Sequence, residues 1–241
     1  MALDAAALLR TGTVALVGRM PYSSNATFLV EVAAAGADPD DPGAEVVQAI
    51  YKPERGERPL WDFPAGLWKR EVAAYELARA LGWDCIPPTV RTDDAPLDTG
   101  SLQLFVDADF AQHYFTLMED EATHPQFQRL CAFDILANNT DRKSGHCLVD
   151  GDGHIWGIDQ GLAFAAEFKL RTVIWDFGGE PVPDALLDDI GGLLEHGLSP
   201  ELAELLDPFE RDAVLTRATA LLHAGRFPVD ETGHRYPWPL V

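Results

Sequence analysis

Short apolar runs separated by polar turns dominate the first half of the chain, and this pattern is typical of β-strands. The runs lie at 13–19, 27–33, 45–52, 86–90 and 101–106. One longer stretch, 69–82, instead repeats its apolar residues at helical spacing and closes with Gly82, a suitable helix C-cap. The first half is therefore predicted to form a five-stranded sheet with one helix.

Helical spacing dominates the second half of the chain. Helices are predicted at 126–137, 186–196 and 209–224. Ser199 and Asp207 each precede a proline, which suits an N-cap followed by proline at the first helical position. One hairpin interrupts the helices, with strands predicted at 145–149 and 153–159 around an Asp-Gly-rich turn.

Together the two halves predict an α+β fold with two lobes and a cleft between them. We expect a β-rich N-terminal lobe over residues 1–106 and a helical C-terminal lobe over residues 107–241.

Acidic residues outnumber basic residues by 39 to 18, which gives the 241-residue chain a formal net charge of −21 at pH 7. This charge repels nucleic acid and anionic membrane surfaces. No apolar run approaches the ~20 residues that a membrane-spanning helix needs. Three widely spaced cysteines, at 85, 131 and 147, do not suggest a disulfide framework. We therefore expect a cytoplasmic protein without a nucleic-acid partner and without stable membrane insertion.

Lysine is scarce in this chain, with four lysines, at 52, 69, 143 and 169, against 14 arginines. A lysine kept among arginines suggests that a compact point charge is needed. Lys52 ends the third predicted strand, and the predicted helix offers two acidic partners, Glu71 and Glu76. Periodicity alone does not decide which of the two faces Lys52.

The strongest candidate chemistry is a pair of carboxylates around the predicted hairpin. Asp141 follows a helix in a loop of polar residues, and Asp159 ends an apolar strand eighteen positions later. Both side chains can point into one cleft. Phosphoryl transfer needs such a pair, because one carboxylate orients the acceptor and another holds Mg²⁺ against the phosphates.

The segments around these carboxylates resemble the catalytic and metal-binding segments of the phosphatidylinositol 3-/4-kinase superfamily. The resembling stretches are 138–142 and 158–164, and 100–106 resembles the hinge strand of the same family. The type II 4-kinases are the nearest branch, and the chain is also similar to an actinobacterial family labelled phosphatidylinositol-kinase-like. The match extends from about residue 13 to residue 177 in the correct order. It implies a two-lobed protein-kinase-like fold that binds ATP and Mg²⁺ or Mn²⁺.

Carried over to this chain, the resemblance implies a role for each matching residue. Asp141 would be the catalytic aspartate, Asp159 the metal-binding aspartate, and Lys52 the ligand of the α- and β-phosphates, paired with Glu71. The remaining implied nucleotide-binding residues are Ser23, Ser24 and Asn25 in the loop over the phosphates, and Phe105 and Val106 in the hinge.

Two features depart from the family pattern. The family has an asparagine as second metal ligand five residues after the catalytic aspartate, where this chain has His146. Imidazole suits Mn²⁺ better than Mg²⁺, so His146 indicates an altered metal preference, weak activity or a structural histidine, and Ser144 is an alternative oxygen ligand. The loop 20–26 lacks glycine, so a plain hairpin turn competes with a phosphate loop.

Two further segments are given structural interpretations. Asp176, Phe177 and Gly178 spell the metal motif of protein kinases, but they follow Asp141 at roughly twice the separation of Asp159, so we interpret Asp176 as structural. The segment 235–241 contains two prolines and is predicted to be neither regular helix nor central strand, but to pack across the surface or to contact a partner.

These observations predict an ATP- and metal-dependent kinase that transfers the γ-phosphoryl group to a hydroxyl of a protein, of the chain itself or of a small molecule. A lipid acceptor is less favoured because of the negative charge and because the segment 53–68 lacks the palmitoylated cysteines of type II lipid kinases. The alternatives are a nucleotide-binding pseudokinase that acts as a regulatory protein, and nucleotidyl transfer on the same scaffold.

Overall fold

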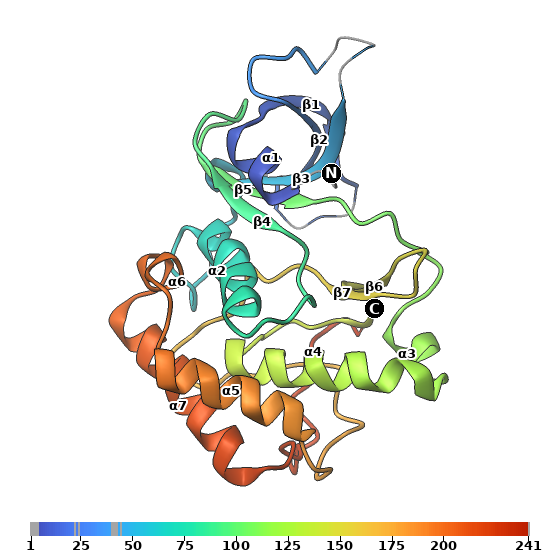
Figure 1. Ribbon diagram of the computed structural model, residues 1–241, viewed down its shortest axis with the longest axis vertical. Helices are drawn as coiled ribbons and strands as arrows, with labels where there is room; N and C mark the ends of the chain where they lie inside the picture. The colour runs from blue at the N-terminus through green and yellow to red at the C-terminus, as the bar shows by residue number, and fades with distance from the viewer. Residues whose placement is uncertain (1–4, 22, 24, 40–42, 44, 241) are drawn as a thin grey trace. The chain divides into compact units, whose positions relative to one another are not determined.

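The computed structural model describes residues 5–21, 23, 25–39, 43 and 45–240. The chain divides into two compact units, labelled by their elements in Figure 1. Unit 1 comprises Met1–Tyr75 and Pro87–Phe105, and unit 2 comprises Glu76–Ile86 and Val106–Val241. The sequence predicted one boundary, after residue 106, and the structure divides the units one residue earlier, after Phe105. Residues 76–86, which the prediction placed in the N-terminal lobe, group with unit 2.

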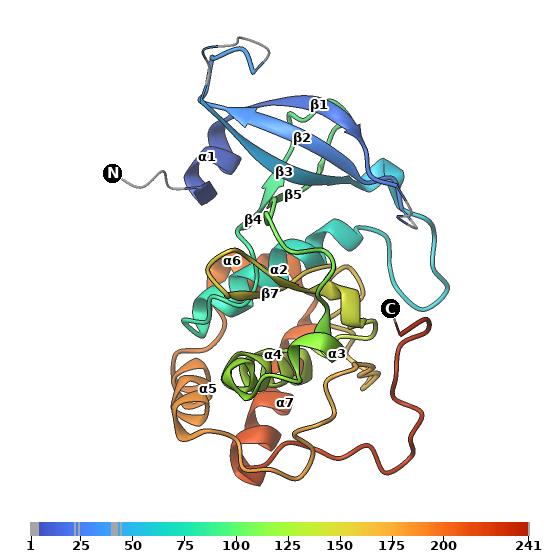
Figure 2. The same ribbon diagram turned by 90° about the vertical axis from the view of Figure 1, so that its right-hand side faces the viewer.

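Unit 1 is built on a five-stranded antiparallel sheet with the strand order β1-β2-β3-β5-β4 (Figure 2). Its strands are β1 (Thr13–Arg19), β2 (Phe28–Ala33), β3 (Val46–Pro53), β4 (Thr89–Thr92) and β5 (Gly100–Leu104). The strand predicted at 86–90 was placed too early. Pro87 and Pro88 cannot donate ladder hydrogen bonds, so pairing starts only at Thr89.

One face of this sheet carries the apolar core of unit 1. A short helix that the sequence pattern did not predict, α1 (Ala5–Thr11), contributes Leu9 to this core. Alternation along β3 places Ala49 and Tyr51 in the same core, whereas Lys52 stands on the opposite face. The remaining buried members of the core are Val30, Val32, Val90, Ala95 and Leu102.

Helix α2 (Leu67–Ala80) begins in unit 1 and ends in unit 2. The carboxylate of Glu57 accepts hydrogen bonds from the backbone amides of Gly66 and Trp68, at 2.8 Å each. These bonds satisfy amides at the start of the helix, where no earlier carbonyl is available. The loop before α2 therefore fixes where the helix starts, and with it the position of each side chain in its first turns.

Unit 2 is built around helix α4 (His124–Ala137), which is buried on all sides over its last two turns. A helix that is apolar all round is typical of a domain interior. Helix α7 (Pro208–Ala224) packs against α4 and against α5 (Asp184–His196). Its buried Arg217 donates hydrogen bonds to the carbonyls of Leu136 and Ala165. The other elements of unit 2 are α3 (Tyr114–Leu117), α5 (Asp184–His196), α6 (Pro200–Leu205), α7 (Pro208–Ala224), β6 (Cys147–Val149) and β7 (Ile155–Gly157), with 3₁₀ turns η2 (Glu121–Thr123) and η3 (Ser144–His146); η1 (Glu54–Gly56) belongs to unit 1.

The predicted helix starts at Ser199 and Asp207 are confirmed. The Ser199 hydroxyl accepts a hydrogen bond from the amide of Leu202, and the Asp207 carboxylate accepts one from the amide of Glu210. No helix in the described part of the chain is both long enough and apolar enough to span a bilayer.

The three cysteines, Cys85, Cys131 and Cys147, are free and buried in unit 2. Burial raises the pKa of the Cys85 and Cys147 thiols to about 12 and that of Cys131 well above its usual value.

Candidate functional site

In unit 1 an ion pair joins the third strand to the start of helix α2. The Lys52 ammonium lies 2.5 Å from the carboxylate of Glu71. Glu71 is almost fully buried, while Lys52 keeps about a fifth of its side chain exposed. Glu76, the other acidic candidate, lies 3.4 Å from Arg79 instead. The expected pairing of Lys52 with Glu71 is therefore present, and its use in nucleotide binding stays a prediction.

A glycine in the neighbouring strand gives Lys52 this position. Gly100 of β5 pairs with Pro53 at the end of β3. A Cβ atom at Gly100 would lie 2.4 Å from the carbonyl oxygen of Lys52 and 2.8 Å from the Tyr51 ring. Any other residue would push the two strands apart at the point where Lys52 leaves the sheet.

The predicted phosphate loop between β1 and β2 holds its own shape through side-chain hydrogen bonds. The Ser23 hydroxyl donates to the carbonyl of Asn25 at 2.9 Å and to that of Met20 at 3.3 Å. The Asn25 side chain accepts a hydrogen bond from the amide of Arg58. Ser24, the third predicted residue of this loop, lies outside the described residues.

The two predicted hinge residues fall on either side of the division between the units. Phe105 is the last residue of unit 1, and its amide donates to the carbonyl of Gln48. Val106 is the first residue of the longer segment of unit 2.

In unit 2 the loop that carries Asp141 starts from a left-handed residue at the end of α4. Asn138 has φ 52° and ψ 51°, a conformation that asparagine tolerates better than most residues. Its side-chain amide donates to the carbonyls of Ala165 and Glu167, and its side-chain oxygen accepts from the amide of Lys169. These bonds join the loop to the segment that follows Asp159.

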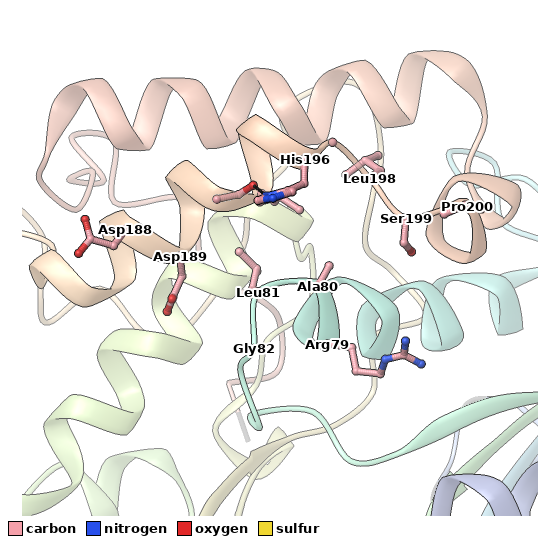
Figure 3. A pocket seen from close by; sticks show the side chains of 13 residues that line it. Arg79, Ala80, Leu81, Gly82, Asp188, Asp189, His196, Leu198, Ser199 and Pro200 are labelled. Atoms are coloured by element: carbon pink, nitrogen blue, oxygen red, sulfur yellow. Dashed lines mark hydrogen bonds between the residues drawn. The ribbon is translucent and has the colours of Figure 1, made fainter.

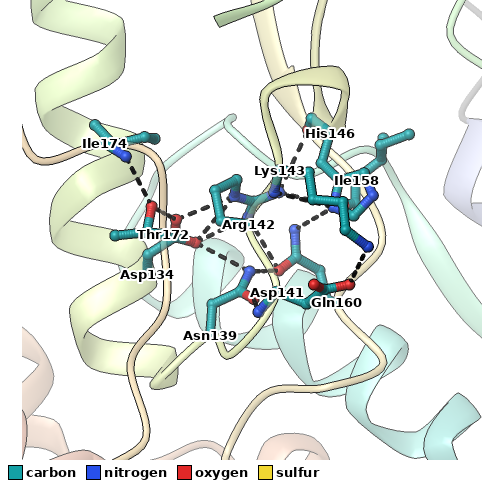
Figure 4. Close-up of polar contacts among 10 residues, drawn as sticks. All are labelled: Asp134, Asn139, Asp141, Arg142, Lys143, His146, Ile158, Gln160, Thr172 and Ile174. Carbon is teal, nitrogen blue, oxygen red and sulfur yellow. Dashed lines mark hydrogen bonds and ion pairs between the residues drawn. The ribbon is translucent and has the colours of Figure 1, made fainter. Parts of the chain in front are cut away.

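A fully buried ion pair supports the loop (Figure 4). The Arg142 guanidinium donates to both carboxylate oxygens of Asp134 at 2.9–3.2 Å, and both side chains are 0% exposed. The same guanidinium also donates to the carbonyl of Ile158 at 2.8 Å and to the Gln160 side chain at 3.1 Å. Arg142 therefore joins helix α4 to the residues on both sides of Asp159.

Asn139 links this buried pair to the backbone of Asp141 through hydrogen bonds. Its side-chain nitrogen donates to Asp134 and Gln160, and its side-chain oxygen accepts the backbone amide of Asp141 at 2.9 Å. Gly157 allows the close packing, because a Cβ atom there would lie 2.7 Å from Leu130 and 3.1 Å from the Arg142 guanidinium. The backbone of Asp141 is thus fixed by side chains that are themselves completely buried.

The Asp141 carboxylate is partly buried and pairs with Lys143. The Lys143 ammonium lies 2.7 Å from the carboxylate (Figure 4). Burial raises the pKa of Asp141, the hydrogen bond and positive charge of Lys143 lower it, and the negative charge of Asp159 raises it again, with a net shift upward. Lys143 was noted in the sequence only as one of the scarce lysines, so its contact with Asp141 is a finding of the structure.

Replacing Lys143 with methionine is expected to raise the pKa of Asp141 further. The substitution removes the two largest influences that lower this pKa, while burial and Asp159 continue to raise it. At a given acidic pH a smaller fraction of Asp141 would then be ionised. A pH titration followed by carboxyl-selective NMR measures the shift directly. Lys169→Met, which removes the Lys169 ammonium 3.9 Å from Glu167, is the matched control and should leave the titration of Asp141 unchanged.

Asp159 and His146 lie beside each other in the same unit. The His146 Nε2 atom is 3.5 Å from a carboxylate oxygen of Asp159. Asp159 adopts φ 60°, and its side chain is half exposed. Ser144, the alternative ligand, is fully buried, and its backbone amide donates to the carbonyl of Leu240. The structure thus brings His146, and not Ser144, next to Asp159.

The donor chemistry of this pair fits a divalent metal that is shared with a phosphate ligand. Among the described residues no group of three or more His, Cys, Asp or Glu side chains forms a closed metal cage. Mg²⁺ in phosphoryl-transfer sites does not need such a cage, because one or two protein ligands, water and substrate phosphates complete its coordination. Asp159 supplies the required carboxylate, and the His146 imidazole suits Mn²⁺.

Asp176 is engaged elsewhere, as its structural interpretation predicts. Its carboxylate accepts a hydrogen bond of 2.5 Å from the Tyr114 hydroxyl, which joins the segment before Phe177 to helix α3. Burial, together with this hydrogen bond and the charge of Asp176, raises the pKa of Tyr114. This contact gives Asp176 a structural role, in line with the interpretation drawn from its spacing.

A pocket of about 630 Å³ lies at the opposite end of α2, within unit 2 (Figure 3). It is lined by the end of α2 around Arg79 and Leu81, by α5 around Asp188 and His196, and by the start of α6 at Pro200. No predicted site residue lines it. The two side-chain clusters described above, one in each unit, are therefore separate from this pocket.

Sequence reasoning missed most of the supporting residues. Asp134 interrupts the apolar run 130–137, and a lone carboxylate among buried positions indicates a buried partner. That signal would have pointed to a buried cationic partner, and the structure shows that this partner is Arg142, which the resemblance covered without giving it a role. Neither Asn139 nor Gln160 carries a comparable signal in the sequence.

No model of a known protein family matches the sequence. The chain is 36% identical to Protein Rv2133c of Mycobacterium tuberculosis (strain ATCC 25618 / H37Rv), in an alignment that covers 98% of this chain and 95% of that protein. The chain belongs to the Rv2133c family. Since the alignment runs over nearly the whole of both proteins, the Rv2133c family shares both units and not one of them alone.

One solved structure identifies the fold of this Rv2133c family member. It is similar to a chain in the structure of hydra Fam20 with sugar, with a TM-score of 0.51, 13% identity and coverage of 90% of this chain and 86% of that chain. The Helicobacter pylori proinflammatory kinase CtkA aligns with a TM-score of 0.49 and 8% identity over 91% of this chain and 94% of its own. The expected α+β, protein-kinase-like fold is confirmed. The narrower resemblance to phosphatidylinositol kinases stays a prediction.

Proposed function

We propose that this member of the Rv2133c family is an ATP- and divalent-metal-dependent kinase that transfers the γ-phosphoryl group to a hydroxyl acceptor. The observation that carries the proposal is the Asp141 carboxylate, held beside Lys143 by a loop that a fully buried ion pair supports. The protein-kinase-like fold supports a phosphotransferase in general terms. Such an enzyme works mainly by positioning and electrostatics, which a rigid loop supplies.

In this proposal Asp141 orients the acceptor hydroxyl and takes its proton as the acceptor oxygen bonds to the γ-phosphorus of ATP and the bond from that phosphorus to the leaving ADP breaks. The raised pKa of Asp141 makes it a better base than an exposed aspartate. The contact with Lys143 keeps the carboxylate ionised and in place until the proton arrives.

Asp159 and His146 are the residues that would hold the metal ion. A bound divalent ion supplies positive charge against the phosphate oxygens. Asp159 is half exposed, so its carboxylate is accessible to a ligand from solution, and the His146 Nε2 atom lies 3.5 Å from it. The mixed oxygen and nitrogen set leads us to expect that Mn²⁺ replaces Mg²⁺ without loss of nucleotide affinity.

Lys52 neutralises nucleotide phosphate charge in this proposal, and Glu71 orients its ammonium. The contact of 2.5 Å and the burial of Glu71 favour a single position for the lysine side chain. Phe105 and Val106 are proposed as residues beside the adenine, and Ser23 and Asn25 as parts of the loop over the phosphates.

A nucleotide-binding pseudokinase is the second candidate. The observation that favours it is His146, because its imidazole stands 3.5 Å from Asp159 at the position where the family pattern has a metal-binding asparagine. A protonated imidazole would compete with a metal ion for the Asp159 carboxylate. A chain of this kind would bind nucleotide weakly and independently of metal.

The first test measures ATP affinity by calorimetry with Mg²⁺ and with Mn²⁺. We expect metal-dependent binding that Asp159→Asn and Lys52→Met each weaken at least tenfold, because each removes a charge that faces phosphate or metal. Asp152→Asn, in the exposed β6–β7 turn, and Lys69→Met, exposed on α2, are the matched controls and should bind as the unmodified chain does. Binding that needs no metal and survives Asp159→Asn would favour the pseudokinase, and no binding with either metal would remove both candidates.

A further inference from the structure

The C-terminal segment of unit 2 runs next to the loop that carries Asp141. After helix α7 the chain continues without helix or strand to its last described residue (Figure 2). Residues 234–240, here named the strap, lie against the loop that follows Asp141 and against the segment 172–175. The carbonyl of Leu240 accepts a hydrogen bond of 2.8 Å from the amide of Ser144, the residue directly after Lys143. The carbonyl of Arg235 accepts hydrogen bonds from the Thr172 amide at 3.2 Å and from the Trp175 indole at 3.0 Å.

The partner of the strap at Thr172 is an extended segment with two hydrogen-bonding edges. On its inner edge Arg171 and Val173 pair with Arg142, through bonds of 3.1 Å and 3.0 Å. On its outer edge the amide of Thr172 points to Arg235 of the strap. This alternation is that of a β-strand, whose outer edge can bind any extended chain through its amides and carbonyls.

The strap covers this edge but is not part of the core. Pro237 is its one buried residue, whereas Trp238 is 88% exposed. The Arg235 guanidinium stacks on the ring of Phe168 at 4.8 Å, and Phe168 is itself about half exposed. Segments with few buried contacts and exposed hydrogen bonds open locally at low free-energy cost.

Ser144 provides a second, independent indication of an incompletely matched contact. Its side chain is fully buried, yet its hydroxyl has no hydrogen-bond partner. Buried hydroxyl groups in proteins nearly always have a partner. The strap thus bonds the amide of Ser144, while the buried hydroxyl of the same residue has no partner with the strap in place.

We propose that the strap covers a binding edge for an extended polypeptide, and that this edge receives the acceptor of the phosphoryl group. The edge consists of the amides of Ser144 and Thr172 and the indole of Trp175. Its role as acceptor site rests on the proposed kinase function, whereas peptide binding does not. The acceptor is a protein segment that adds as a strand and places an arginine or lysine over Phe168, as Arg235 does. The net charge of −21 favours such a cationic partner.

Hydrogen exchange on the full, unmodified chain gives the first test, read by NMR at single amides. If the strap opens locally, the amides of Ser144 and Thr172 exchange at least tenfold faster than the amides of Val173 and Arg142, which bond within the body of unit 2. Equal protection of all four amides would overturn the proposal, because the strap would then open only with the whole fold.

The second test uses a labelled, end-capped synthetic peptide of residues 232–240 as probe, with fluorescence polarisation as readout. Arg235→Glu in the full chain should weaken the strap, since a carboxylate over the negative face of Phe168 is repelled, and the variant should bind the peptide at least tenfold more tightly than the unmodified chain. Arg19→Glu, an exposed residue of β1 with the same charge change, is the control and should bind as the unmodified chain does. Equal peptide affinity of Arg235→Glu and the unmodified chain would refute the covered edge.

The same measurement separates this inference from the proposed function. Adding Asp159→Asn to Arg235→Glu should leave peptide affinity unchanged, because Asp159 is not part of the edge. Peptide binding without ATP binding would refute the proposed kinase function and support the proposed peptide-binding edge. ATP binding without peptide binding to Arg235→Glu would support the proposed nucleotide site and refute the proposed peptide-binding edge.

Discussion

Replacing Asp141 with asparagine is expected to lower the rate of ATP-dependent phosphoryl transfer by about 10²- to 10⁴-fold, the usual contribution of a positioned general base. Asparagine keeps the shape of the side chain but cannot take the acceptor proton. Its contact with Lys143 loses the carboxylate charge, while the backbone amide bond to Asn139 remains. The measurement is the initial rate of ADP release with an acceptor present.

Binding experiments on the same variant distinguish a chemical defect from a structural one. Asp141→Asn should bind ATP with unchanged affinity, and its melting temperature should not fall, because burial disfavours the ionised carboxylate that it removes. A variant that keeps its rate would exclude Asp141 as the base. A variant that loses ATP affinity together with its rate would assign the residue to the nucleotide site instead.

Replacing Asp134 with alanine is expected to destabilise the fold by about 3–5 kcal/mol, because it leaves the Arg142 guanidinium buried without a counter-charge. For a chain of this size the melting temperature should fall by roughly 6–20 °C. Thermal or urea unfolding followed by circular dichroism measures the change. The loss is large because the Asp134–Arg142 pair and its hydrogen bonds have no access to water that could replace the missing partner.

A second Asp–Arg pair of unit 2 provides the control for this prediction. Asp84 lies 2.8 Å from Arg129, nearly the same distance as in the buried pair, but the Asp84 side chain is 67% exposed. Asp84→Ala should therefore cost no more than about 1 kcal/mol. Combining Asp134→Ala with Arg142→Met should recover part of the loss, since no unpaired charge remains buried. If Asp134→Ala and Asp84→Ala lowered the free energy of unfolding equally, burial would not determine how much an Asp–Arg pair contributes to stability.

Most of the sheet and the long helices could be predicted from the sequence, because their signals are local. The apolar run at 13–19 coincides with β1, and the helix predicted at 126–137 lies within α4. Helix α1 was missed because it is a single short stretch whose one buried residue, Leu9, produces no periodicity. The apolar character of the segment 86–90 predicted a strand, but Pro87 and Pro88 shift the start of β4 to Thr89.

The candidate site could be predicted only where a residue carries its own signal. Asp141, Asp159 and Lys52 stand at the ends of elements, where a motif makes them visible. The choice between Glu71 and Glu76 depended on which turn of α2 faces β3, and only three-dimensional packing decides it. The strap was recognised as irregular from its prolines, but its contact at Ser144 joins positions almost a hundred residues apart in the sequence.

The buried thiols of unit 2 make the chain suitable for spectroscopic labelling without removal of native cysteines. Reagents such as maleimides react with the thiolate, and Cys85 and Cys147, with pKa values raised to about 12, hold almost none of it at neutral pH. A single cysteine introduced at the exposed His234 would therefore take up a fluorophore or spin label selectively. Quenching of that label by Trp175, whose indole donates to the carbonyl of the adjacent Arg235, would then report in real time how often the strap leaves its edge.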